Sequence, residues 1–315
     1  MSEKTFCKEF LELSKYIICT PKRKKINEKL YQQNQYKTYQ IFDAIMVNAD
    51  NYHEIKKNNT FDLSEKIIRN IKNRERDYHS EFENYSSLGC FLSHRILWEK
   101  CYESGKPILI MEDDVEICIR DLTIFNKIVK KYLNNKECKK IQYLLSLLEN
   151  HEIFLNFFPN QSNLFGLIDD KYTWNYDIKN SPPISCGTQC YIINPNVAKS
   201  LLVNSKLIDC HVDYYLMRES KKNEIEISYL KNIYTPFSSN IDILHLLYSN
   251  SINYSVPIKE KKFVIGNVNI TSELNNIKNL KTIFYFIIYH LTLLLSIIQN
   301  FLKGNINYMR IKYFV

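Results

Sequence analysis

The chain has 315 residues, 45% of them apolar and 24% charged, so it can bury a substantial core and is neither disordered nor collagen-like. Its net charge of +8 comes mostly from lysine, and its densest basic run, residues 22–25, is short, so we expect no nucleic-acid partner. The six glycines form no cluster, which excludes the phosphate-binding loop and the G-x-G-x-x-G dinucleotide fingerprint.

The amino-terminal part predicts a polar lead and then two strands. Residues 1–14 mix charged with apolar side chains and lack the apolar core of a signal peptide. Residues 15–20 predict a strand, 26–39 a helix and 39–47 a second strand. The polar stretch 51–83 has weak periodicity and predicts a helix with a loop.

The nine cysteines include no C-x-x-C pair and have no regular spacing. This pattern indicates neither a structural zinc site nor a disulfide framework. A reducing environment is the simpler inference, and we predict a cytoplasmic protein.

The centre of the sequence predicts a buried helix that leads into a buried strand. Residues 88–104 carry apolar side chains at helical spacing, with Ser86 and Ser87 as candidates for the N-cap and Gly105 as the stop. Residues 108–111 (ILIM) are continuously apolar, as in a strand that is covered on both faces.

Further strands and helices alternate after that strand. Residues 122–133 predict a helix, 141–148 a strand, 190–193 a strand and 196–202 a helix, whereas the aromatic segment 151–183 is irregular. This alternation predicts an α/β fold in which a mixed, mainly parallel sheet is flanked by helices.

The last part of the chain changes character. Residues 15–260 form the predicted main domain and 261–281 a linker, followed by an uncharged apolar helix at 282–302. That helix is long enough to act as a membrane anchor, but it contains polar residues such as His290 and Gln299. Association with a membrane and packing on the domain both remain open.

Three acidic residues, Glu112, Asp113 and Asp114, follow the buried strand directly. Adjacent carboxylates repel one another unless a positive group lies between them, and Mg²⁺ or Mn²⁺ prefers such oxygen ligands. Alternation along the strand places Glu112 and Asp114 on one side and Asp113 on the other. A metal site and a solvated turn are both compatible with this cluster alone.

Two segments of the chain match a known signature. The first contains Gly89-Cys90-Phe91-Leu92-Ser93-His94, then Trp98, and then residues 107–114 (PILIMEDD). The second contains residues 187–193 (GTQCYII), 198–202 (AKSLL) and His211-Val212-Asp213. Together they resemble glycosyltransferase family 25, which includes lipooligosaccharide and collagen hydroxylysine galactosyltransferases. The departures are His211 in place of proline, Cys19-Thr20 in place of Asn-Leu, and the apolar tail.

The resemblance implies a GT-A fold, a UDP-sugar donor that carries galactose or glucose, Mn²⁺ or Mg²⁺, and transfer with inversion to a hydroxyl of a glycan or of hydroxylysine. Glu112, Asp114 and His245 are the implied metal ligands, and Asp213 is the candidate base, although it also fits a helix N-terminal carboxylate. The implied donor-binding residues are Thr20, Arg23, Gly89, Ser93, His94 and Asp113.

Two other functions remain open at this point. A metal-dependent phosphoester hydrolase would also use clustered acids at strand ends, but it would give the Ser93-His94 helix no role. A non-catalytic protein could retain the fold without turnover, and the altered segment at His211 leaves room for it.

Overall fold

The computed structural model describes the chain over most of its first 239 residues. The described ranges are 5–24, 31–33, 36–76, 80–117, 121–135, 138–146, 166–179, 187–239, 264–265 and 268–269. The predicted metal ligand His245 and the predicted apolar helix 282–302 lie outside these ranges, as does half of the predicted helix 26–39.

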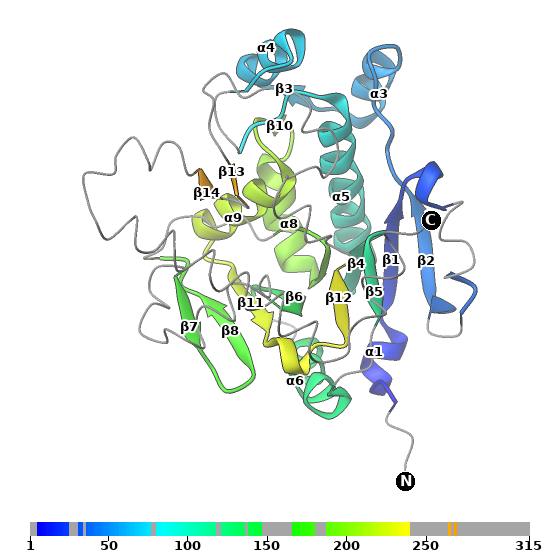
Figure 1. Ribbon diagram of the computed structural model, residues 1–315, viewed down its shortest axis with the longest axis vertical. Helices are drawn as coiled ribbons and strands as arrows, with labels where there is room; N and C mark the ends of the chain where they lie inside the picture. Colours follow the sequence, from blue (N-terminus) through cyan, green and yellow to red (C-terminus); the bar gives the residue numbers. More distant parts are fainter. Residues whose placement is uncertain are drawn as a thin grey trace.

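A mixed sheet runs through the middle of the molecule (Figure 1). Its strand order is β2-β1-β4-β9-β6-β11-β8-β7. The pairings are parallel within β2-β1-β4 and between β6 and β11, while β9 and β8 are antiparallel to their neighbours. Six of the eight strands therefore point the same way. The bounds are β1 Ser14–Cys19, β2 Tyr39–Asp43, β4 Ile108–Glu112, β6 Lys140–Ser146, β7 Leu167–Asp169, β8 Thr173–Tyr176, β9 Cys190–Ile193 and β11 Glu226–Leu230.

Helices cover both faces of this sheet and confirm the predicted α/β class. One face packs against α5 (Tyr85–Ser104), α8 (Pro195–Asn204) and α9 (Val212–Lys222), and the other against α1 (Lys8–Glu12) and α6 (Leu122–Asn134). We call these the α5 face and the α6 face.

Alternation along β4 supplies both cores. Ile108 and Ile110 belong to the core on the α5 face, whereas Leu109 and Met111 belong to the core on the α6 face. All four side chains are at most 2% exposed, as expected for a strand that is covered on both sides.

Smaller elements complete the described structure. They are α3 (Tyr52–Asn59), β3 (Asp62–Leu63), α4 (Glu65–Asn73), β5 (Val115–Ile117), β10 (Leu207–Ile208), a 3₁₀ turn (Asn232–Tyr234), β12 (Phe237–Ser239), β13 (Val264–Ile265) and β14 (Val268–Asn269). The β13–β14 pair lies within the segment expected to be a linker. Among the helices that the structure describes, none is long and apolar enough to cross a membrane.

The sequence predicted one end of α5 correctly and the other end wrongly. Gly105 ends the helix in the left-handed conformation, with φ of 63°, as predicted. The N-cap prediction was wrong: the cap is Asn84, whose side chain accepts a hydrogen bond from the backbone N–H of Ser87. Asn84 has the extended backbone that a capping residue needs, while the two serines already lie inside the helix.

The region predicted to be irregular also needs correction. Residues 167–169 and 173–176 form β7 and β8, which pair with each other and extend the sheet beyond β11. The predicted strand 39–47 is shorter than expected, because pairing with β1 ends at Asp43.

Candidate functional site

The three acidic residues lie where two parallel strands end side by side. Glu112 is the last residue of β4, and its register partner on β1 is Ile18. Thr20, just beyond β1, therefore lies beside Asp113. In α/β sheets, ligands bind outside the carboxyl ends of the strands. This sheet edge is therefore the natural place for a binding site.

Asp113 connects to the end of β1. One of its carboxylate oxygens accepts a hydrogen bond from the Thr20 backbone N–H at 3.1 Å, and the other pairs with the Arg23 guanidinium at 3.0 Å. Burial raises the pKa of Asp113, although Arg23 and the Thr20 N–H act in the opposite direction. Thr20, Arg23 and Asp113, three of the predicted donor-binding residues, thus lie together.

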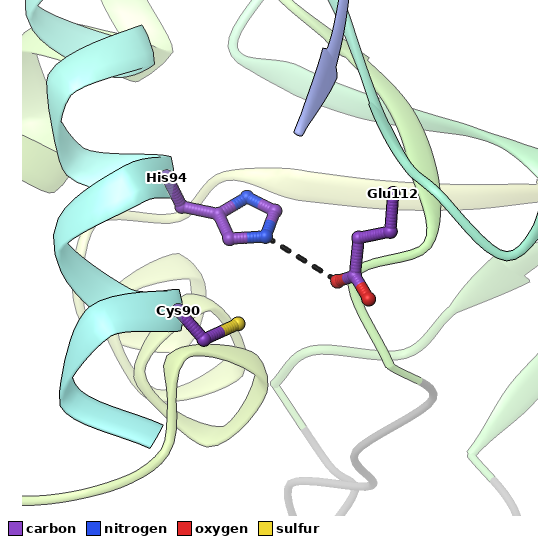
Figure 2. A group of neighbouring side chains, drawn as sticks. All are labelled: Cys90, His94 and Glu112. Carbon is purple, nitrogen blue, oxygen red and sulfur yellow. Dashed lines mark hydrogen bonds and ion pairs between the residues drawn. The ribbon is translucent and has the colours of Figure 1, made fainter. Parts of the chain in front are cut away.

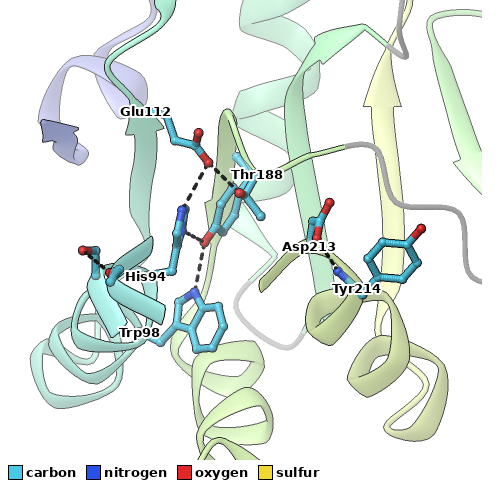
Figure 3. Close-up of polar contacts among 9 residues, drawn as sticks. His94, Trp98, Glu112, Thr188, Asp213 and Tyr214 are labelled. Carbon is cyan, nitrogen blue, oxygen red and sulfur yellow. Dashed lines mark hydrogen bonds and ion pairs between the residues drawn. The ribbon is translucent and has the colours of Figure 1, made fainter. Parts of the chain in front are cut away.

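Glu112 faces α5 instead (Figure 3). Its Oε1 lies 3.3 Å from His94 Nε2 and accepts a hydrogen bond from the Thr188 hydroxyl at 2.5 Å. Burial raises the pKa of Glu112, but the hydrogen bonds and charges supplied by His94, Thr188 and Arg23 outweigh it, so the pKa lies below its usual value. Glu112 is therefore held as a carboxylate.

His94 is held from its other side by a buried tyrosine. Its Nδ1 lies 2.8 Å from the Tyr191 hydroxyl, which also accepts a hydrogen bond from Trp98 Nε1 at 3.0 Å. His94, Trp98 and Tyr191 are all fully buried. The Tyr191 hydroxyl can donate to Nδ1 or accept from it, and in both cases the contact fixes the ring with Nε2 facing Glu112. The result is an ordered chain of contacts from Trp98 to Glu112.

Asp114 differs from the other two acids. Its Oδ1 is buried and has no hydrogen-bond partner among the described residues. Burial, together with the negative charges of Glu112 and Asp113, raises the pKa of Asp114 to about 7. An orphaned buried carboxylate oxygen beside an ionised glutamate fits a divalent cation, which would satisfy both.

Gly89 and Ser93 hold the chain after β2 against α5. A Cβ at Gly89 would lie 2.1 Å from the carbonyl oxygen of Ile45, so only glycine allows this approach. The Ser93 hydroxyl donates to the Gly89 carbonyl at 2.7 Å and accepts from the Ile45 N–H at 2.8 Å. Ser93 is fully buried, so its contacts are with the protein backbone.

Asp213 lies in the first turn of α9 (Figure 3). Its Oδ1 accepts a hydrogen bond from the Tyr214 N–H at 2.8 Å. The turn before it is anchored by His211, whose N–H donates to Ser80 O at 2.9 Å and whose Nε2 lies 3.3 Å from the buried Arg76.

Cys90 is a site residue that the sequence analysis did not single out. It lies one helical turn before His94 on α5, and its thiol points toward Glu112 (Figure 2). Burial raises the pKa of the thiol well above its usual range, and the charges of Glu112, Asp213 and Asp114 raise it further. Cys90 thus lies near both Glu112 and Asp213. The helical spacing of Cys90, His94 and Trp98 was the available signal.

Comparison with known proteins now decides the family. Residues 15–216 match the sequence model of "Glycosyltransferase family 25 (LPS biosynthesis protein)". The chain belongs to glycosyltransferase family 25. A similar curated protein, the "Glycosyltransferase 25 family member" of Drosophila melanogaster, is 31% identical over 93 residues, which cover 29% of this chain and 15% of that relative. The chain thus matches only a small part of that relative's length.

The matched region of this family 25 chain contains every described site residue from Thr20 to Asp213. The two segments that carried the resemblance, 89–114 and 187–193, contact each other through Thr188 with Glu112 and through Tyr191 with His94. The roles of Thr188 and Tyr191 were not predicted, because a threonine just before an apolar strand and a tyrosine within it look like ordinary core residues. All seven described cysteines are free.

Proposed function

We propose that this family 25 chain is a metal-dependent, inverting glycosyltransferase with a GT-A arrangement, which moves galactose or glucose from a UDP-sugar to a hydroxyl of a glycan or of hydroxylysine. The proposal rests on two carboxylates at the end of β4. Glu112 is held in place by His94 and Thr188, and Asp114 has a buried oxygen with no hydrogen-bond partner among the described residues.

Glu112 and Asp114 would hold Mn²⁺ or Mg²⁺, with His245 still proposed as a further ligand. When bound, the cation would neutralise negative charge on the nucleotide diphosphate. Thr188 and His94 keep the Glu112 carboxylate oriented before any ligand arrives, so little reorganisation is needed on binding.

Arg23 provides positive charge beside Asp113, on the side of the acidic residues that faces away from α5. Its side chain is 42% exposed, and one nitrogen is fixed by Asp113. A guanidinium held in this way can contact a phosphate oxygen of the donor with its remaining N–H groups. Thr20 and Asp113 orient Arg23, while Gly89 and Ser93 act indirectly by fixing the chain beside α5.

Asp213 is the proposed base. Inversion requires a single displacement: the acceptor hydroxyl oxygen bonds to the anomeric carbon, the bond to the diphosphate breaks, and a carboxylate takes the hydroxyl proton. Two observations support this role. Asp213 acts electrostatically on Cys90 together with Glu112 and Asp114, and Arg76 and Ser80 hold the turn before Asp213 through His211.

The test measures UDP release from a panel of UDP-sugars with Mn²⁺, for the wild type, Asp114→Asn and Asp50→Asn. Asp50 is an exposed carboxylate on the loop after β2, so its substitution is the matched control. We expect Asp114→Asn to lower turnover at least about a hundredfold. Removal of one group that stabilises the charge of the transition state commonly has an effect of this size. Wild-type turnover in Asp114→Asn would contradict the metal assignment, and cleavage of a generic phosphodiester without UDP release would favour the hydrolase.

A further inference from the structure

The thiol of Cys90, a ring nitrogen of His94 and a carboxylate oxygen of Glu112 lie within 4.8 Å of one another (Figure 2). We propose that these three residues form a second cation site, selective for thiophilic ions such as Zn²⁺, that shares Glu112 with the catalytic cation and so inhibits transfer when filled. The inhibitory part rests on the proposed function, whereas binding of the ion does not.

The ligand types set the selectivity. Sulfur and imidazole nitrogen with one carboxylate suit Zn²⁺ or Co²⁺, while Mg²⁺ and Mn²⁺ favour sites built from oxygen. Cys90 and His94 project from one face of α5, and Glu112 reaches them from the end of β4. Ligand atoms bound to tetrahedral zinc lie roughly 3.3–3.8 Å apart, so the three groups need to close by only about 1 Å.

Two of the three ligands already have outer partners of the kind that metal sites use. Tyr191 holds His94 at Nδ1, which leaves Nε2 directed at Glu112, and Thr188 fixes the Glu112 carboxylate. Outer hydrogen bonds of this kind orient a ligand and set which histidine nitrogen faces the metal. His94 needs no new rotamer to become a ligand.

The surroundings also favour a cation. Asp113, Asp114 and Asp213 act electrostatically on the Cys90 thiol, so negative charge surrounds the site. The Glu112 side chain is 24% exposed and Cys90 is half-buried, which leaves a route from solvent. On coordination the thiol would release its proton to solvent, and the sulfur lone pair would form the metal bond.

The first experiment titrates the full chain with Co²⁺ and follows the near-ultraviolet charge-transfer band of a cobalt–thiolate bond. We expect the band in the wild type and in Cys138→Ser, and its loss in Cys90→Ser. Cys138 is a matched control because it is also half-buried and free. Absence of the band from the wild type, or an undiminished band in Cys90→Ser, would overturn the proposal.

A second measurement needs no variant and therefore does not depend on how Cys90→Ser folds. Zn²⁺ should slow alkylation of Cys90 by N-ethylmaleimide at least about tenfold, since a bound thiolate is shielded, and should leave Cys138 unaffected, as read from peptide masses. Equal alkylation of Cys90 with and without Zn²⁺ would count against the site.

A third arm separates this proposal from the proposed function. Asp114→Asn should keep the cobalt–thiolate band although it loses transfer, because Asp114 supplies no ligand to the Cys90 site. In the wild type, Zn²⁺ inhibition should weaken as Mn²⁺ is raised. Absence of transfer under every condition would refute the proposed function and leave the binding result standing, whereas inhibition that is indifferent to Mn²⁺ would refute the sharing of Glu112.

Discussion

The two faces of the sheet bury different chemistry around the same strand. On the α5 face, the helix places Ser93 and His94 at 0% exposure, and each has hydrogen-bond partners. On the α6 face, the core is a cluster of aliphatic and aromatic side chains, with Lys15 as a buried charge at its edge. The comparison shows that β4 is anchored by apolar packing on both faces, and that the α5 face adds a buried polar network that holds Glu112.

The largest effect should come from adding one methyl group on the α5 face. Gly89→Ala places a Cβ against the Ile45 carbonyl, so we expect a loss of about 3 kcal/mol or more in the free energy of unfolding. Urea denaturation measures it. Gly105→Ala is the control: nothing lies within 4 Å of its Cβ, and only the positive φ is strained, so it should cost about 1 kcal/mol. Equal losses in both variants would show that the close approach at Gly89 does not matter.

Two tyrosine variants, one on each face of the sheet, compare the contribution of a hydroxyl inside the polar network with that of a hydroxyl outside it. Tyr191→Phe leaves the buried nitrogens of Trp98 and His94 without their shared partner, and should lower stability by about 2 kcal/mol. Tyr39, at the α6 face, has a buried hydroxyl for which the described residues offer no hydrogen-bond partner, so Tyr39→Phe should raise stability by about 1 kcal/mol.

Activity separates these two tyrosine variants further. Tyr191→Phe should also reduce UDP release about 10- to 100-fold, because His94 no longer holds Glu112 as firmly. Tyr39→Phe should keep wild-type turnover. If both variants have the same stability and activity, the series of hydrogen bonds that links Trp98, Tyr191, His94 and Glu112 contributes to neither.

The last prediction concerns Lys15, and its effect appears only as a dependence of stability on pH. Its Nζ donates to the carbonyls of Leu11 and Leu13, both at 2.9 Å, and burial lowers the pKa of Lys15 from 10.5 to about 8. Between these two values the unfolded chain binds more protons than the folded chain, so stability rises with pH across that window. Lys15→Met should flatten this rise in urea unfolding at pH 8 and pH 10.

The control for Lys15 is Lys8, whose side chain is 82% exposed. Lys8→Met should keep the wild-type slope of stability against pH. Since a pKa difference of one unit corresponds to about 1.4 kcal/mol, the change in slope should be measurable. A wild-type slope in Lys15→Met would mean that the amine is no more costly to charge in the folded protein than in water.

The sequence predicted the parts of the fold that local pattern determines. Three elements had strong local signals and each was found: the apolar run 108–111, the helical periodicity that ends at Gly105 and the helical segment 196–202. β7 and β8 were missed because they are short, lie in an aromatic and polar segment, and owe their existence to pairing with β11.

The same distinction applies to the site. The alternation of Glu112 and Asp113 follows from strand geometry, and their contacts with His94 and with Arg23 lie on opposite sides as expected. The role of Cys90 depends on how α5 packs against β4, and that of Tyr191 on how α5 packs against β9. A local sequence pattern does not predict such packing. The donor-binding and metal assignments remain predictions.

The most direct test of the central claim is Mn²⁺ binding measured by electron paramagnetic resonance, in which the signal of free Mn²⁺ falls as the ion is bound. For the wild type and Asp50→Asn we predict one bound Mn²⁺ per chain, with tighter binding when UDP is present. For Asp114→Asn we predict loss of that binding, with a midpoint of thermal unfolding no lower than that of the wild type. Equal Mn²⁺ binding by the wild type and Asp114→Asn, with or without UDP, would contradict the account.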